Sequence, residues 1–178
     1  MLNRVIYYVD SVFRYECNYE MLEVLLKAGL SVHLVGEGHD DLLEKYSSLI
    51  TNHGASDIDD VIELMSKSKV VINPCPAVFE RGFHERIFSA MLCKAAIFTP
   101  YTEYAEETIG EYLELVDMRN LEGMVDRIKS IISNFDAYKV LKIDKSYEYA
   151  AKYHTWEKRG EQIIDFYENG CQMNIDFL

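Results

Sequence analysis

The chain segment from residue 73 to residue 104 contains the residues best suited to binding an anionic ligand. The candidate residues there are Arg81, Gly82, His84, Glu85, Arg86, Ser89, Tyr101 and Thr102. We expect a helix over Gly82–Cys93, whose first N–H groups have no partner within the helix and therefore favour a negative charge. Its core positions are expected at Ile87, Ala90 and Met91. Gly82 lets a ligand approach the backbone closely, and Arg86, four residues later, shares its helix face. The competing interpretation is an ordinary surface helix with solvated charges.

The elements that must position this segment alternate between strands and helices. Strands are predicted at Arg4–Val9, Ser31–Val35, Leu49–Asn52, Lys69–Asn73, Ala95–Thr99 and Tyr112–Val116. Helices are predicted at Cys17–Ala28, Asp40–Tyr46, Ser56–Met65, Gly82–Cys93, Thr102–Thr108, Leu121–Ser133, Tyr138–Lys152 and Trp156–Asn169. Such alternation with short connections predicts an α/β fold, a Rossmann-like parallel sheet with helices on both faces.

Ligands of open parallel sheets bind in the crevice beyond the carboxyl ends of the strands. The loops expected there are Asp10–Glu16, Gly36–Asp40, His53–Ser56, Asn73–His84 and Thr99–Glu103. They add further candidate binding residues, which are Arg14, Gly36, Gly38, His53 and Gly54. The Gly36-Glu37-Gly38 turn follows the second predicted strand and is no GxGxxG, so a dinucleotide fingerprint is not expected.

The length, charge and composition of the chain exclude several classes of function. A chain of 178 residues is long enough for one domain, so residues 1–178 are expected to form a single unit with C-terminal helices at about 154–169. The net charge of −12 argues against a nucleic-acid groove. No apolar run is long enough for a membrane span, and four scattered cysteines indicate reduced thiols in a cytoplasmic protein. The sequence shows no clustered set of metal ligands.

Several segments, in the same order, resemble motifs of family-4-like glycosyltransferases of the GT-B fold. The run Gly82–Lys94 is similar to the stretch G-F-G-x-x-x-x-E-A-M-A-C-G, and more so to the spore-protein-like branch. The run Leu30–Gly38 resembles G-x-x-V-x-L-x-G-x-G, and Ser66–Asn73 resembles S-x-x-x-x-x-P-S. Tyr153–Arg159 is similar to the H-T-[YW]-x-x-R helix start. The resemblance covers most of the chain.

The resemblance implies the C-terminal, donor-binding half of a glycosyltransferase. The donor would be a nucleotide-sugar, bound as a substrate with no cofactor or metal. Arg14 and Arg86 would neutralise its diphosphate, and His53-Gly54 would lie near the base or ribose. An N-terminal acceptor domain, or a second copy in a homodimer, would complete the assembly. The apolar face of the last helix, with Ile163, Ile164 and Tyr167, is expected to pack within the chain or in a dimer.

Two departures leave other functions open. The paired glutamates of the family fall at Arg81 and Ser89, with only Glu80 and Glu85 nearby, and the family glycine at the helix end is Lys94. A binding or interaction module without turnover is therefore an alternative. Another α/β nucleotide-binding enzyme of flavodoxin-like topology is a second alternative, since a fold alone does not fix function.

Overall fold

The computed structural model describes residues 2–74 and 81–169, with side chains from Ser11 onward. Its strands are β1 (Val32–Leu34), β2 (Ile50–Asn52), β3 (Val70–Ile72), β4 (Ala96–Pro100) and β5 (Glu114–Val116). Its α-helices are α1 (Leu2–Lys27), α2 (Asp40–Lys45), α3 (Ile58–Lys67), α4 (Glu85–Leu92), α5 (Glu103–Ile109), α6 (Leu121–Ser133), α7 (Phe135–Tyr138), α8 (Asp144–Tyr153) and α9 (Trp156–Asn169). A 3-10 turn, Gly110–Tyr112, precedes β5, and a π-helical turn, Lys139–Ile143, joins α7 to α8.

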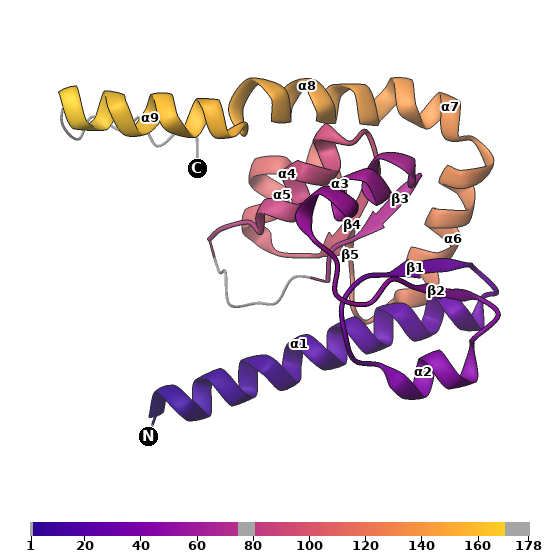
Figure 1. The fold of residues 1–178 in the computed structure, drawn as a ribbon. Helices are drawn as coiled ribbons and strands as arrows, with labels where there is room; N and C mark the ends of the chain where they lie inside the picture. Colours follow the sequence, from indigo (N-terminus) through magenta and orange to yellow (C-terminus); the bar gives the residue numbers. More distant parts are fainter. Residues whose placement is uncertain (1, 75–80, 170–178) are drawn as a thin grey trace.

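The described strands pair in parallel in two groups (Figure 1). β1 pairs with β2, with Val32 opposite Ile50. β4 lies between β3 and β5, with Phe98 opposite both Ile72 and Glu114. The predicted α/β arrangement of parallel strands is confirmed.

Helices cover both faces of the sheet formed by β3, β4 and β5. Because side chains alternate along a strand, Phe98 packs in one cluster with Leu25 of α1 and Ile128 of α6. Ile97 packs on the opposite face with Met65 of α3 and with α4. The positions of α4 that the sequence assigns to the core are all buried: Ile87, Ala90 and Met91.

The first predicted strand is wrong. Arg4–Val9, and the loop expected at Asp10–Glu16, lie within α1, which continues unbroken to Lys27. The β-branched and aromatic residues of this stretch favour a strand, but Leu2–Lys27 contains no glycine or proline that would end a helix. Continuation of the helix therefore outweighs local propensity, which is a weak determinant. The predicted helix end at Gly29 is confirmed by its φ of 77°.

Two helices begin later than the sequence predicts. α4 starts at Glu85 behind His84, so Gly82 lies in the preceding loop and shares no helix face with Arg86. α3 is capped by Asp57, whose Oδ1 accepts the Asp60 N–H at 3.0 Å, and not by Ser56. Aspartate is as good an N-cap as serine, and its negative charge also interacts favourably with the positive end of the helix dipole.

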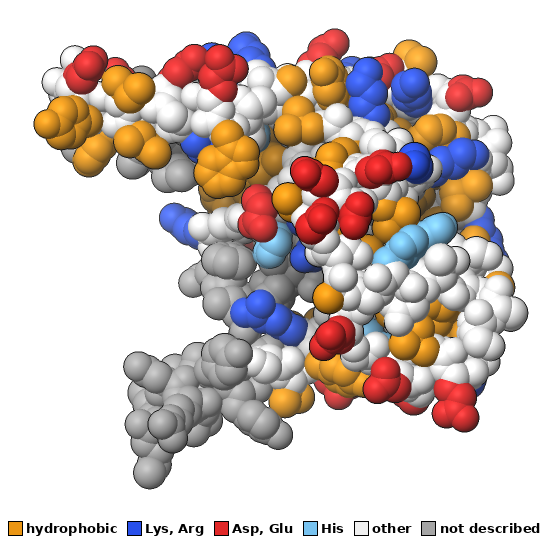
Figure 2. Space-filling model, viewed as in Figure 1, with side chains coloured by type: hydrophobic (Ala, Val, Ile, Leu, Met, Phe, Trp, Pro, Cys, Tyr) orange, Lys and Arg blue, Asp and Glu red, His pale blue; other side chains and the backbone are white. Residues whose placement is uncertain are grey.

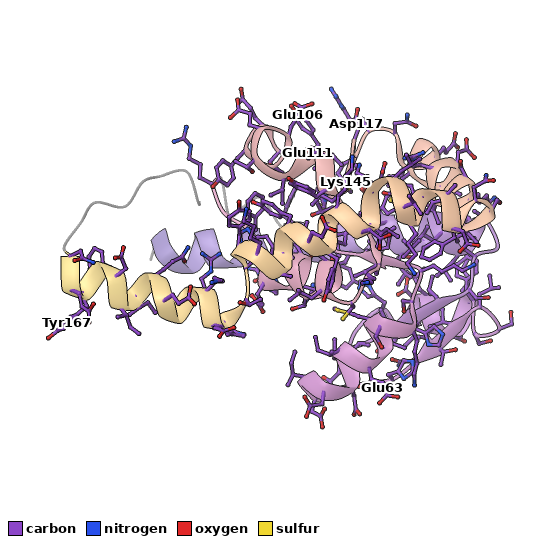
Figure 3. All side chains as sticks on the ribbon, turned by 90° about the horizontal axis from the view of Figure 1, so that it is seen from above. Glu63, Glu106, Glu111, Asp117, Lys145 and Tyr167 are labelled. Carbon is purple, nitrogen blue, oxygen red and sulfur yellow. The ribbon has the colours of Figure 1, made fainter. Side chains whose placement is uncertain are left out.

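α8 and α9 form an arm on the side of the molecule opposite α1 (Figure 1). The α9 side chains expected to pack are exposed: Ile163 is 68 %, Ile164 58 % and Tyr167 89 % accessible. Tyr167 points away from the body of the domain in Figure 3. No part of the chain that the structure describes packs over this face, and its burial in a dimer stays a prediction. No helix in the described ranges is long and apolar enough to cross a bilayer.

Candidate functional site

A buried hydrogen-bond network ties the carboxyl ends of β3 and β4 to α4. Asn73 is fully buried and donates from Nδ2 to the Thr99 hydroxyl at 3.2 Å. Its Oδ1 accepts a hydrogen bond of 3.3 Å from the Arg86 guanidinium. A buried amide that is hydrogen-bonded through both its nitrogen and its oxygen has little freedom to move. The network therefore holds the Arg86 guanidinium in place at the edge of the sheet.

His84 stands between this network and solvent as the N-cap of α4. Its Nδ1 accepts the Arg86 N–H at 3.2 Å. Burial lowers the pKa of His84, and the positive charges of Arg86 and Arg14 lower it further, against the opposing effect of Glu85. Nδ1 is therefore an acceptor at neutral pH, and the Glu85 carboxylate at 3.4 Å is no ion-pair partner of a neutral imidazole.

The positive charges of Arg14 on α1 and Arg86 on α4 both lower the pKa of His84. Two predicted phosphate ligands, Arg14 and Arg86, thus act on the same histidine although α1 replaces the expected loop. Figure 2 shows Lys, Arg and His side chains on the hollowed side of the molecule between α9 and the start of α1. This local positive charge contrasts with the net charge of −12 and can hold an anion.

A second group of predicted residues gathers at the carboxyl ends of β1 and β2. The Gly36 N–H donates to the Gly54 carbonyl oxygen at 2.7 Å. Gly36, Gly38 and Gly54 have φ of 112°, 105° and 63°, a backbone conformation that favours glycine. His53 Nε2 lies 2.9 Å from His33 Nδ1, and the two rings stack.

A hollow of ≈ 390 Å³ opens beside His53. Its lining combines three apolar side chains with five polar or charged residues: Val35, Val61 and Leu64, and His53, Ser56, Asp60, Glu63 and Lys67. Small-molecule sites are usually more apolar than this, so the hollow offers one apolar patch among polar groups. The hollow is therefore suited to a flat, partly apolar group.

The loop after β4 holds two of the predicted binding residues, Tyr101 and Thr102. Thr102 caps α5, since its Oγ1 accepts the Ala105 N–H at 3.0 Å. Tyr101 is half exposed, with its hydroxyl donating to Glu106 at 2.7 Å. Tyr104 stacks on Phe83 with ring centroids 5.1 Å apart, so one face of this ring is already covered.

The remaining candidates lie at or near α4 without a common centre. Arg81 is exposed in the turn before the helix, and Gly82 and Ser89 are half-buried. Glu85 is exposed, whereas Glu80 falls outside the described residues. Among side chains in the described parts of the chain, no three of His, Cys, Asp and Glu group as metal ligands.

Sequence reasoning missed the two residues that organise the site, Asn73 and Thr99. Both are polar side chains that end apolar strands of the predicted sheet. A polar residue at the carboxyl end of a buried parallel strand is a usable signal, because the crevice for ligands lies at that edge.

Solved structures share this fold at low sequence identity. Anabaena HepE in complex with UDP and glucose is 18 % identical, with a TM-score of 0.63, over 85 % of this chain and 44 % of that chain. A glycosyltransferase from Rickettsia africae is 16 % identical, with a TM-score of 0.69, over 87 % and 44 %. TarM is 17 % identical, with a TM-score of 0.61, over 86 % and 32 %. The predicted resemblance to a domain of GT-B glycosyltransferases is confirmed for the fold.

The chain spans less than half the length of these structures. A search of curated proteins finds no match. A family model described as glycosyl transferase-like matches residues 16–165, which covers most of the chain. The chain belongs to the glycosyl transferase-like family.

Proposed function

We propose that the chain is a donor-binding domain, which holds a nucleotide diphosphate sugar for transfer to an acceptor hydroxyl. The observation that carries the proposal is the position of Arg86 at the carboxyl edge of the sheet, where it is bonded to the buried Asn73, with the charge of Arg14 acting on the neighbouring His84. Residues 1–178 act as one domain in this proposal, and the nucleotide-sugar is a substrate that needs no separate cofactor.

The two arginines address the charge that the reaction creates. When the bond between the sugar and the diphosphate breaks, negative charge develops on the leaving phosphate oxygen. Guanidinium groups fixed in place before the reaction stabilise that charge without a reorganisation cost. The first N–H groups of α4 add to the positive field, although His84 occupies one of them.

The hollow beside His53 supplies a place for the base and ribose. Its apolar lining from Val35, Val61 and Leu64 suits the face of a base. The Asp60 carboxylate, at the same hollow, can accept hydrogen bonds from ribose hydroxyls but would repel a phosphate. The base would therefore sit over β1 and β2, and the diphosphate near α4. Two HepE structures contain UDP with glucose or UDP-glucose, which makes uridine the first base to test.

The acceptor and the catalytic base would come from outside this chain, either from an N-terminal acceptor domain or from a second copy. No described carboxylate stands at the two family glutamate positions, which are Arg81 and Ser89. In this proposal, the family glutamates' contacts to the donor sugar are either made by Glu85 in a different geometry or lost.

Thermal denaturation with UDP, GDP, ADP and TDP, each at millimolar concentration, tests the proposal. A ligand that binds only the folded state adds about 2.7 kcal/mol of stability at a hundredfold excess over Kd. One diphosphate is expected to raise the Tm, and Arg14→Ala or Arg86→Ala to remove the rise. Lys129→Ala is the matched control, since it removes one exposed positive charge on α6 and should leave the rise intact. Absence of any shift would exclude the donor-binding proposal.

A second candidate function is a binding module that keeps the fold without turnover. The observation that favours it is the replacement of both family glutamates by Arg81 and Ser89. Binding of UDP-glucose without release of UDP, measured with acceptor domain added, would separate this module from an enzyme.

A further inference from the structure

β1 and β3 each have an unpaired edge. The Val32 N–H and the Leu34 carbonyl oxygen bond toward β2, so the N–H and C=O of His33 face the other edge of β1. On β3, the Lys69 carbonyl oxygen and the Asn73 N–H bond toward β4, so the N–H and C=O groups of Val70 and Ile72 face the opposite edge. Within the described residues, no strand pairs with either of these edges. Such edges are acceptors for another strand.

The two sheets fit into one known strand order. Doubly wound sheets commonly place their strands in the order 3-2-1-4-5-6. The observed pairs, β2 with β1 and β3 with β4 and β5, match positions 3-2 and 4-5-6 of that order. Position 1 of that order, which belongs to the strand nearest the N-terminus, falls between β1 and β3.

β1 and β3 already share one hydrophobic layer. Val32 of β1 packs against the same cluster as Val70 and Ile72 of β3, and this cluster contains Met21 and Leu25 of α1. The C-terminal part of α1 therefore covers both sheets. A strand between β1 and β3 would lie beneath this helix and complete the layer.

We propose that β1 and β3 form a slot for a sixth parallel strand, and that residues 4–9 of the same chain fill it. This segment, Arg-Val-Ile-Tyr-Tyr-Val, is rich in β-branched and aromatic residues. Residues 10–31 are long enough for the right-handed crossover that parallel neighbours require, which takes about a dozen residues or more.

The first turns of α1 extend away from both sheets (Figure 1). Three large side chains in the next part of α1 are exposed: Val12 is 42 %, Phe13 49 % and Tyr15 44 % accessible. With residues 4–9 in the slot, α1 would begin near Cys17, and the Arg14 segment would become a loop at the carboxyl edge of the sheet. The structure then represents the open state of an exchange between helix and strand.

The variant Val5→Ala/Ile6→Ala separates the two states by the sign of its effect. In the slot, these adjacent side chains would be buried on opposite faces of a central strand, so the Tm should fall by about 5 °C or more. In a projecting helix, alanine improves helix propensity, and the Tm should stay the same or rise slightly. Val12→Ala/Phe13→Ala is the control, because it truncates exposed apolar residues of α1 outside the proposed strand and should change the Tm by less than about 2 °C.

The 13Cα chemical shifts of residues 4–9 in the wild-type chain provide an independent readout. Strand-type shifts in the monomer, together with the fall in Tm, are the expected result. Helix-type shifts with an unchanged Tm would overturn the proposal. Strand-type shifts confined to a dimer fraction that grows with concentration would overturn it as well, because a second copy would then supply the strand. Neither readout involves a nucleotide, so the result does not depend on the proposed donor site.

Discussion

The exposed Arg86 donates a hydrogen bond of 3.3 Å from its guanidinium to Oδ1 of Asn73, a residue with no accessible surface. A charged side chain on the rim of the sheet is thus anchored to a fixed point in the core. Asn73 is itself held by the Thr99 hydroxyl at 3.2 Å. Rigid support of this kind reduces the side-chain entropy that Arg86 would lose on binding an anion.

Replacement of Asn73 by alanine should weaken nucleotide binding even though Asn73 itself need not touch the ligand. Loss of one supporting hydrogen bond to a charged group is worth about 1.5 kcal/mol, which raises Kd about tenfold. The Kd for the preferred diphosphate, measured by calorimetry, checks this. Thr99→Ser keeps the hydroxyl and should bind as the wild type does, and equal Kd values for Asn73→Ala and the wild type would show that the anchor is irrelevant.

Lys94 occupies a position where the backbone demands glycine. Its φ is 57°, in the left-handed region, and the Ala95 N–H bonds back to the Ala90 carbonyl oxygen at the end of α4. Lys94→Gly removes the strain of a side chain in that conformation, roughly 1 kcal/mol, but loses the contact of Nζ with the Tyr147 ring at 4.4 Å. An exposed cation–π contact is worth about 0.5 kcal/mol, so we expect a small net gain.

Urea denaturation of Lys94→Gly and of Lys94→Gln tests this account. The glutamine variant loses the cation and keeps the strain, so it should be less stable than the wild type. A glycine variant that is less stable than the glutamine variant would contradict the strain argument.

Glu114 should govern stability in acid. Burial opposes its ionisation, but hydrogen bonds from Arg127 and Tyr138 and the charge of Lys142 outweigh burial and lower its pKa to about 2. The unfolded chain takes up this proton near pH 4.5, so the stabilisation is complete above that pH and is lost as the pH falls toward 2. The side chain is 14 % exposed, and the contribution is about 2 kcal/mol.

Glu114→Gln should therefore lower the Tm at pH 7 by about 5 °C and flatten the decline of Tm between pH 4.5 and 2. Asp117→Asn, which breaks an exposed pair with Arg119, is the control and should change the Tm little. A Glu114→Gln profile parallel to that of the wild type would assign the acid sensitivity to other groups.

His154 should act in a higher pH range. Its ring stacks on Phe88 at 3.8 Å, and its Nδ1 lies 2.9 Å from Nη2 of Arg159, which requires a neutral imidazole. Burial, and then the charge of Arg159, lower its pKa to about 4. Since the unfolded chain binds the proton near pH 6.5 and the folded chain only near pH 4, acid favours unfolding throughout this interval.

His154→Gln should reduce the slope of Tm against pH between 6.5 and 4. Lys152→Gln, on the same helix, leaves the imidazole in place and should keep the wild-type slope. An unchanged slope in His154→Gln would show that the ring is not protonated on unfolding in this range.

The sequence predicted the parallel sheet and the long helices well where apolar periodicity was strong. α6 and α9 have the bounds expected, and Ile87, Ala90 and Met91 are buried as expected. Periodicity fails at Arg4–Val9, because an apolar, β-branched run is compatible with either state and the neighbouring helix decides.

The site was predictable only in outline. The rule for strand ends located the loops, and the glycines with positive φ confirm the turns at Gly36, Gly38 and Gly54. The start of α4 was missed because histidine is an uncommon cap, and the Asn73–Arg86 bond depends on a contact between elements thirteen residues apart. Sequence patterns describe one element at a time and do not contain such contacts.

The apolar face of α9 should mediate self-association. Trp156, Ile163 and Tyr167 recur at helical spacing and are 87 %, 68 % and 89 % exposed. A face of this kind on a projecting helix marks an interaction surface. In sedimentation runs at 0.15 M salt, the wild type should form dimers as concentration rises, and Ile163→Glu/Tyr167→Glu should stay monomeric. Val140→Glu/Leu141→Glu, which alters another exposed apolar pair at 69 % each, should dimerise as the wild type does. A wild type that is monomeric at every concentration would contradict self-association through α9. The acceptor domain would then be the expected partner of α9. In that case, adding the acceptor domain as a separate chain should protect Trp156 from fluorescence quenching by acrylamide.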